Sequence, residues 1–281
     1  MSELLKVPTM AEFMAQGKQP EVLFLVGCAG SFDDRAKKIT KAFVKILNKA
    51  NVEFAVLGTE ESCTGDPAKR AGNEFLFQMQ AVTNIEVLNA YEVKKIVTAC
   101  PHCFNTIKNE YPELGGNYEV MHHTQFLKTL LDEGRLTIEG GKYKGKRITF
   151  HDPCYLGRAN NVYEAPRELI IKLEAELIEM KNCKRNGLCC GAGGAQMFKD
   201  AEKGDKEVNV ERTEQALDVK PEIIAAGCPF CNTMMTDGVK AKEKEMIEVV
   251  IFSWVLAFVI IIFAYIKYLI SERKKKLNND Q

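Results

Sequence analysis

The sequence predicts an α/β fold made of two tandem Rossmann-like parallel-sheet repeats related by duplication, plus a C-terminal transmembrane helix. Apolar runs such as residues 22–26 are each followed by apolar residues at helical spacing, as in 35–50, which is typical of a buried parallel strand and its crossover helix. The stretch Val249 to Ile270 carries only one charge, at Lys267. At about 1.5 Å per residue it would extend about 33 Å, enough to cross a hydrocarbon core of about 30 Å.

Length and composition suit two domains of ordinary size in a reducing compartment. The chain has 281 residues, 46% of them hydrophobic, and its 38 basic residues balance 38 acidic ones, which argues against nucleic acid as a partner. Ten cysteines are present, yet the N-terminus shows no apolar signal-peptide core. We therefore expect reduced thiols, which are more often metal-binding or catalytic than bridged.

The first half reads as alternating strands and helices. We expect strands at residues 22–26, 54–57, 96–99 and 118–121, and helices at 35–50, 75–88, from 105 onward and at 124–133. The expected divisions are an N-terminal arm (1–20), a first cysteine-rich repeat (21–133), a linker (134–146), a second repeat (147–245), and a transmembrane helix with a basic tail (246–281).

Cysteine spacing predicts that the second half repeats the first. Cys28 and Cys100 are 72 residues apart, and Cys154 and Cys228 are 74 residues apart. The intervals from the first cysteine to the middle one are 35 and 36 residues. Each cysteine position follows an apolar strand, so we expect the thiols to gather at the carboxyl ends of parallel strands, where open α/β sheets bind ligands.

The second repeat carries a set of five cysteines around a glycine-rich loop, residues 187–194. They are Cys154, Cys189, Cys190, Cys228 and Cys231. Adjacent cysteines rarely form a disulfide with each other, and a structural zinc ion needs only four ligands. Five converging thiolates suit a polynuclear iron–sulfur centre better, although buried structural cysteines are the plainer alternative. The two Cys-Pro-x-Cys pairs should lie at helix N-termini, which stabilise thiolates.

The order Cys, Cys-Cys-Gly, Cys-x-x-Cys, occurring twice over residues 22–238, resembles the cysteine-rich CCG domain of the B-type heterodisulfide reductase subunit and related iron–sulfur oxidoreductases. Phrases such as 64–67 (Thr-Gly-Asp-Pro), 100–106 and 151–157 look most like the branch associated with electron-transfer flavoprotein and fatty-acid oxidation. The resemblance implies a non-cubane [4Fe-4S] cluster held by the five cysteines of the second repeat. In the first repeat Thr64 replaces the second adjacent cysteine, so four thiols remain: Cys28, Cys63, Cys100 and Cys103. These suit a conventional [4Fe-4S] cluster, a zinc ion or an unoccupied vestige.

The same resemblance implies an iron–sulfur electron-transfer subunit that passes electrons between a flavoprotein or ferredoxin-type donor and a quinone-linked membrane partner. Larger members carry ferredoxin-type clusters, and this chain has no Cys-x-x-Cys-x-x-Cys-x-x-x-Cys-Pro run. We therefore expect a separate ferredoxin-type subunit and little activity of the chain alone. Two alternatives stay open: a thiol–disulfide reductase that acts on a heterodisulfide at the cluster, and a zinc-stabilised assembly scaffold.

Several other residues near these motifs allow both a chemical and a structural interpretation. His102 could tune thiolates, relay a proton or face solvent, whereas we expect His122 and His123 to be structural. His151 and Asp152 are expected to form hydrogen bonds around the metal centre. Arg158 would offset the charge of the centre or form a surface ion pair, and Cys183 would be an ordinary free thiol. For location we expect the cytoplasmic membrane, with both repeats in the cytoplasm. The basic run 273–276 opposes that orientation under the positive-inside rule, and 246–281 could also be a late fusion.

Overall fold

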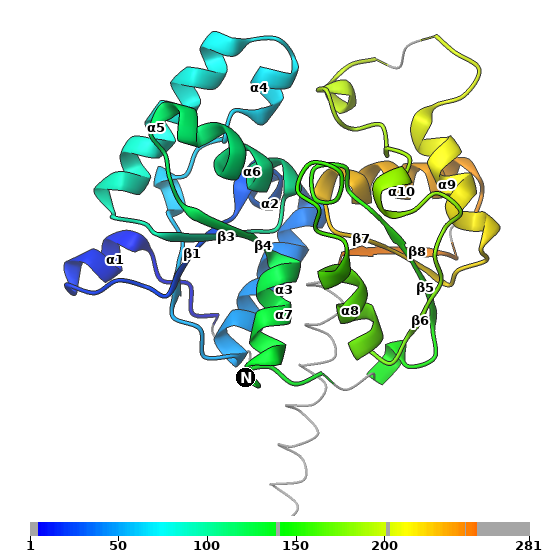
Figure 1. The fold of residues 1–281 in the computed structure, drawn as a ribbon, viewed down its shortest axis with the longest axis horizontal. Coiled ribbons are helices and arrows are strands. Elements are labelled where there is room, and N and C mark those ends of the chain that lie inside the picture. The colour runs from blue at the N-terminus through cyan, green and yellow to red at the C-terminus, as the bar shows by residue number, and fades with distance from the viewer. Residues whose placement is uncertain (1–4, 139–140, 201–202, 245, 252–281) are drawn as a thin grey trace, which may run out of the picture.

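The computed structural model describes residues 5–138, 141–200, 203–244 and 246–251, which form two parallel sheets side by side (Figure 1). The first sheet has the order β2-β1-β3-β4, and the second has the order β6-β5-β7-β8. The strands of the first sheet are β1 (Val22–Leu25), β2 (Phe54–Ala55), β3 (Lys95–Thr98) and β4 (Glu119–His122). Those of the second sheet are β5 (Arg147–His151), β6 (Glu176–Leu177), β7 (Ile223–Ala226) and β8 (Glu248–Ile251). The predicted duplication of a parallel α/β unit is therefore confirmed.

The helices follow the pattern predicted for crossover connections. They are α1 (Met10–Ala15), α2 (Gly27–Phe32), α3 (Asp34–Lys49), α4 (Asp66–Arg70), α5 (Glu74–Ala90), α6 (Pro101–Asn105), α7 (His123–Asp132), α8 (Glu164–Lys172), α9 (Val208–Asp218) and α10 (Pro229–Ala241). Helix α3 begins where the Asp33 carboxylate accepts the Ala36 N–H at 2.8 Å. Near the N-terminus, Thr9 pairs with Val56 and Met10 is buried, so the start of the chain packs against the first sheet.

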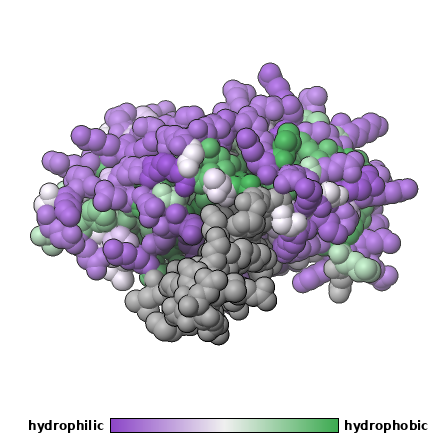
Figure 2. Space-filling model, turned by 90° about the horizontal axis from the view of Figure 1, so that it is seen from below, coloured by the Kyte–Doolittle hydropathy of each residue, from purple (hydrophilic) through white to green (hydrophobic). Residues whose placement is uncertain are grey.

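The two repeats share one hydrophobic core. Helices α3, α7 and α8 lie between the sheets (Figure 1), and their apolar faces bury one cluster with both sheets. Phe43 and Phe126 from the first repeat join Phe150 and Leu169 from the second in that cluster. Seen from below (Figure 2), hydrophilic residues cover most of the coloured surface, and hydrophobic residues show in smaller areas between them. Because they share this core, the two repeats are packed against each other and do not form separate domains.

The predicted transmembrane helix is wrong where the structure describes it. Residues 249–251, its expected start, belong to β8, which pairs in parallel with β7 through Ile224 and Val249 and through Ala226 and Ile251. No helix within the described residues is long and apolar enough to cross a membrane. The rest of the expected span, 252–270, lies outside the described residues. The physical reason for the error is that a short apolar run fits a buried strand as well as the start of a helix.

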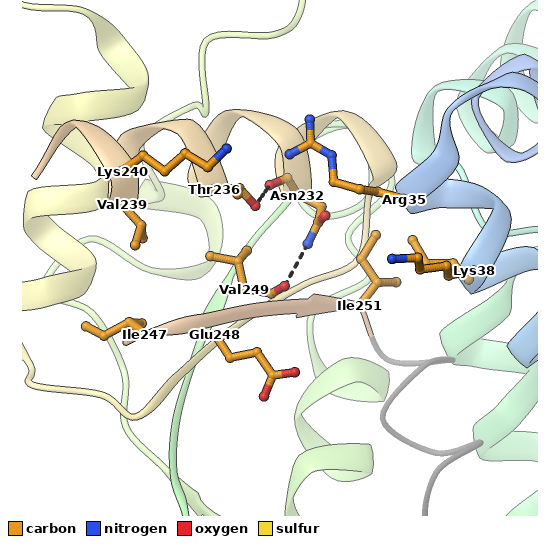
Figure 3. Close-up of a pocket in the computed structure, with 11 residues that line it drawn as sticks. Arg35, Lys38, Asn232, Thr236, Val239, Lys240, Ile247, Glu248, Val249 and Ile251 are labelled. Atoms are coloured by element: carbon orange, nitrogen blue, oxygen red, sulfur yellow. Dashed lines mark hydrogen bonds between the residues drawn. The ribbon is translucent and has the colours of Figure 1, made fainter. Parts of the chain in front are cut away.

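A hollow of about 420 Å³ lies between α3, α10 and β8 (Figure 3). Its wall includes Ile39, Val239 and Val249, with the cations Arg35 and Lys38 on the α3 side. The residues that line it include no cysteine or histidine. The hollow therefore has no thiol chemistry of its own.

Candidate metal centre

The sheet topology places the cysteines at one kind of position in both repeats. In each sheet the strand order reverses between two central strands, β1 and β3 or β5 and β7, and ligands of open α/β sheets bind at such points. Cys28 and Cys100 follow β1 and β3, and Cys154 and Cys228 follow β5 and β7. Cys100 and Cys228 are the residues directly before α6 and α10, as predicted for Cys-Pro-x-Cys pairs. All ten cysteines are free thiols.

The five cysteines of the second repeat form one connected set. The Sγ atoms of Cys190 and Cys231 are 3.2 Å apart, and the Gly191 N–H donates to Cys189 Sγ at 3.3 Å. Hydrogen-bond contacts between thiols also join Cys154 to Cys189, Cys189 to Cys190, and Cys231 to Cys228. The prediction from the sequence named these five as ligands, and the fold brings all of them together.

The first repeat reproduces this arrangement with one sulfur fewer. Thr64 takes the place of Cys190, and its hydroxyl donates to Cys103 Sγ at 3.7 Å, the counterpart of the contact between Cys190 and Cys231. The next residue, Gly65, has φ +89°, and its counterpart Gly191 has φ +87°. A left-handed backbone favours glycine at both positions, so the two loops turn alike. Thiol contacts pair Cys28 with Cys63 and Cys100 with Cys103.

The two thiol sets meet where the repeats face each other. Cys100 of the first repeat and Cys228 of the second are in hydrogen-bond contact. Helices α2 and α10, from different repeats, pack together in the same region (Figure 1). A metal centre in the second repeat would therefore lie next to the first set of thiols.

Hydrogen bonds among the thiols prepare particular sulfurs as thiolates. Donation from Cys154 and then from Cys190 lowers the pKa of Cys189 far below its usual value. Donation from Cys28 lowers the pKa of Cys63 to about 6. Contacts with Cys103 and Cys228 hold the pKa of Cys100 well below its usual value. Each set can therefore offer negative sulfur to a metal near neutral pH.

A buried arginine, which was not singled out from the sequence, borders the second set. Arg212 of α9 is fully buried and donates from Nε to His151 Nδ1 at 3.0 Å. A ring nitrogen of His151 and the sulfurs of Cys190 and Cys231 all lie within 4.8 Å of one another. Burial, followed by the charge of Arg212, lowers the pKa of His151 to about 3. Comparison of the two repeats was the one sequence signal that could have drawn attention to Arg212.

A second buried pair holds the loop before Cys189. Asp152 receives two hydrogen bonds from Arg167, at 2.7 and 3.0 Å, and one from the Lys184 N–H at 2.7 Å. Arg167 also donates to Glu179 at 2.6 and 2.9 Å. Arg158, an exposed residue, donates from Nη2 to the Gly187 carbonyl at 2.7 Å. These contacts fix the approach of the chain to the adjacent cysteines.

His102 lies between the repeats and does not face solvent. Its Nδ1 is 2.8 Å from the Asp66 carboxylate, and its ring packs edge-on against Tyr155 and Phe230 of the second repeat, with centroids 4.8 and 5.2 Å away. Although burial alone would lower it, the hydrogen bond with Asp66 raises the pKa of His102 above its usual value. The solvent-facing interpretation is therefore wrong, whereas tuning of the thiolates and proton relay stay predictions.

The remaining histidines are structural, as expected. His122 donates from Nε2 to the Gly227 carbonyl at 2.9 Å and so ties β4 to the residue before Cys228. His123 is fully buried against Phe43. Cys183 is partly exposed and takes no part in either set.

The donor set fits a negatively charged, sulfur-rich metal centre. Five sulfurs converge, and two buried nitrogens near them, His151 Nε2 and Arg212 Nη2, have no hydrogen-bond partner within the described part of the chain. Unsatisfied buried donors call for an acceptor, and a cluster of thiolates and sulfides supplies acceptors. Fold and site together define a duplicated α/β protein whose thiols gather at the carboxyl edges of two parallel sheets, an arrangement suited to metal binding.

The chain belongs to the CCG family, the cysteine-rich domain, whose model matches residues 22–108 and 148–236. Three relatives carry names that bear on its chemistry. The probable iron-sulfur-binding oxidoreductase FadF of Bacillus subtilis is 48% identical over 241 residues, 85% of this chain and 34% of that protein. The EtfAB:quinone oxidoreductase of Syntrophomonas wolfei is 48% identical over 82% of this chain and 33% of its own.

The third relative is a component of the dihydromethanophenazine:CoB--CoM heterodisulfide reductase of Methanosarcina barkeri. This reductase polypeptide is 32% identical over 81% of this chain and 56% of its own length. The chain thus spans about a third of the length of the first two relatives and about half of the third. An iron–sulfur centre bound by the cysteine-rich domain agrees with all of these findings.

Proposed function

We propose that this chain is the electron-transfer part of an iron–sulfur oxidoreductase complex, which passes electrons between a flavoprotein or ferredoxin-type donor and a quinone-linked acceptor. The observation that carries the proposal is the connected set of five thiols in the second repeat, joined through Cys228 and Cys100 to the first set. Two adjacent thiol sets give electrons a short path between repeats. The names of the relatives support a role in redox chemistry, since two are oxidoreductases and one is part of a reductase.

The cofactor of the second repeat is, in this proposal, a non-cubane [4Fe-4S] cluster held by Cys154, Cys189, Cys190, Cys228 and Cys231. The cluster supplies one-electron redox chemistry when bound. The residues of the chain hold it, keep water away through buried positions such as Cys228 and Cys231, and supply hydrogen-bond donors. The first repeat, with Cys28, Cys63, Cys100 and Cys103, would hold a conventional cluster or a zinc ion.

A second candidate function, reduction of a disulfide at the cluster, rests on the solvent exposure of two of the five cysteines. Cys154 and Cys189 are partly exposed, whereas the other three cysteines of the set are buried, so a thiol or disulfide from outside could approach from that side. Reduction of a heterodisulfide by the isolated chain would separate this function from electron transfer alone. A membrane location with both repeats in the cytoplasm stays a prediction.

Anaerobic purification followed by iron and sulfide quantitation and electron paramagnetic resonance tests the proposal. Cys190→Ser should remove the paramagnetic signal of the second repeat, because it deletes a central member of the thiol set. Cys183→Ser is the matched control, since Cys183 is a free thiol outside both sets, and it should leave iron content and spectrum unchanged. Zinc without sulfide in the wild-type chain would instead identify an assembly scaffold. Fast quinone reduction by the chain alone would contradict the role of one component in a larger complex.

A further inference from the structure

The pair formed by His151 and Arg212 has a hydrogen-bond direction that the structure fixes. A guanidinium has donors and no acceptor, so the contact of 3.0 Å between Arg212 Nε and His151 Nδ1 requires Nδ1 to be the unprotonated ring nitrogen. The proton of the neutral imidazole is then on Nε2. A protonated ring nitrogen can donate a hydrogen bond but cannot bind a metal ion.

Arg212 is held firmly enough to impose this tautomer. Its Nη1 donates to the Asn182 carbonyl at 2.7 Å and to the Gln215 side chain at 3.0 Å. Both Arg212 and His151 are fully buried, so no bulk water competes for Nδ1. His151 Nε2 remains a buried donor without a partner among the described residues, in a ring close to Cys190 and Cys231.

The first repeat has no such pair at the equivalent positions. His151 ends β5 three residues before Cys154, and Leu25 ends β1 three residues before Cys28. Arg212 lies six residues before the end of α9, and Asn84 lies six residues before the end of α5.

Asn84, unlike Arg212, leaves none of its side-chain polar atoms without a hydrogen-bond partner. It donates to the Cys63 carbonyl at 2.9 Å and contacts the Tyr111 hydroxyl at 3.2 Å, and its oxygen accepts from Ser62 at 3.0 Å. The second repeat therefore differs from the first in having the buried N–H donors of His151 and Arg212, which are unpaired within the described residues, as well as one more cysteine in its thiol set.

We propose that His151, oriented by Arg212, is a positioning residue that donates its Nε2–H to a sulfur of the metal centre in the second repeat and is not a ligand of that centre. The inference rests on the proposed cluster in this repeat. A hydrogen bond to a cluster sulfur stabilises the added negative charge of the reduced state, so it raises the reduction potential. The second repeat would then hold the electron more tightly than a centre without such donors.

The test replaces each partner by its counterpart from the first repeat in the full chain. His151→Leu removes the donor, His151→Gln keeps an N–H near the same place, and Arg212→Asn removes the group that selects the tautomer. His123→Leu is the control, because it deletes a buried imidazole that lies against Phe43. The readouts are iron and sulfide content, the midpoint potential of the second-repeat signal, and electron–nuclear double resonance of exchangeable protons.

The proposal requires that His151→Leu keep the wild-type iron and sulfide content, shift the midpoint to more negative values and lose one exchangeable proton coupling. His151→Gln should restore most of the potential, and His123→Leu should change neither quantity. An unchanged potential and proton coupling in His151→Leu would overturn the proposal, and so would loss of iron from both His151 variants, because that would make His151 a ligand. If His151→Leu does not fold, His151→Gln and Arg212→Asn decide by the same readouts. Absence of iron and sulfide from the wild-type chain would instead refute the proposed function itself.

Discussion

Arg167→Met should destabilise the protein far more than the loss of an exposed ion pair. The side chains of Arg167 and Asp152 are each 3% exposed, and two hydrogen bonds join them. Without the guanidinium, the Asp152 carboxylate stays buried with only the Lys184 N–H as a donor. Removing one partner of a buried pair costs about 3–5 kcal/mol, because the other charge is left uncompensated.

Arg135→Met is the matched control for this comparison. Arg135 also makes two hydrogen bonds to one carboxylate, that of Glu21, at 2.7 and 2.9 Å, but the two side chains are 29% and 37% exposed. Solvent screens such a pair, whose loss should cost about 0.2–1 kcal/mol.

Urea unfolding of the metal-free, reduced chains at neutral pH measures both effects. For a typical denaturant dependence of about 2–3 kcal/mol per molar, Arg167→Met should lower the midpoint by about 1–2 M and the control by a few tenths. Equal shifts in the two variants would refute the reasoning. A large shift in Arg167→Met should be accompanied by poorer metal loading, because Asp152 also holds the Lys184 segment that leads to Cys189.

Three further predictions follow from the site and its packing. Burial lowers the pKa of His122 from about 6.5 to about 4, so its contribution of about 3 kcal/mol to stability is complete above pH 6.5 and is lost as the pH falls through 4. His122→Gln should therefore reduce the slope of unfolding free energy against pH in this range by about one proton. An unchanged slope would contradict this prediction. Thr64→Cys should add a paramagnetic signal like that of the second repeat, whereas Cys63→Ser should leave the second-repeat signal intact; the reverse pattern in spectra of loaded protein would show that the sets are misassigned. Gly238→Ala should lower the free energy of unfolding by about 1–3 kcal/mol, since the added Cβ would lie 2.1 Å from the Thr213 hydroxyl between α9 and α10; wild-type stability would mean that the helices separate freely.

The sequence was sufficient for most strands and for both thiol sets. Apolar runs ending at cysteines predicted β1, β3, β5 and β7, since the carboxyl ends of parallel strands lie on one edge of a sheet. The resemblance to the CCG motif then identified Thr64 as the counterpart of Cys190, and the contacts to Cys103 and Cys231 agree with that assignment. These predictions succeeded because they depend on local pattern and on one general property of α/β sheets.

The parts that could not be predicted depend on how the repeats face each other. Nothing in the spacing indicates that Cys100 contacts Cys228, or that His102 packs against Tyr155 and Phe230. Arg212 lies on α9, 58 residues after Cys154, and an arginine in a helix usually reads as surface charge. Its role depends on the fold, in which Arg212 Nε donates to His151 Nδ1 at the end of β5.

The edge strand β8 decides where the chain can be shortened. Its Val249 carbonyl accepts from the Asn232 side chain at 3.2 Å, and Asn232 directly follows Cys231 in α10. Ile251 at its end packs with Ala29 and Ile39 of the first repeat. A version trimmed at Met246 to remove the apolar tail would therefore strip the second sheet of an outer strand and loosen the helix that carries two of the thiols. A version that ends just after Ile251 would retain both, and expression trials should begin there.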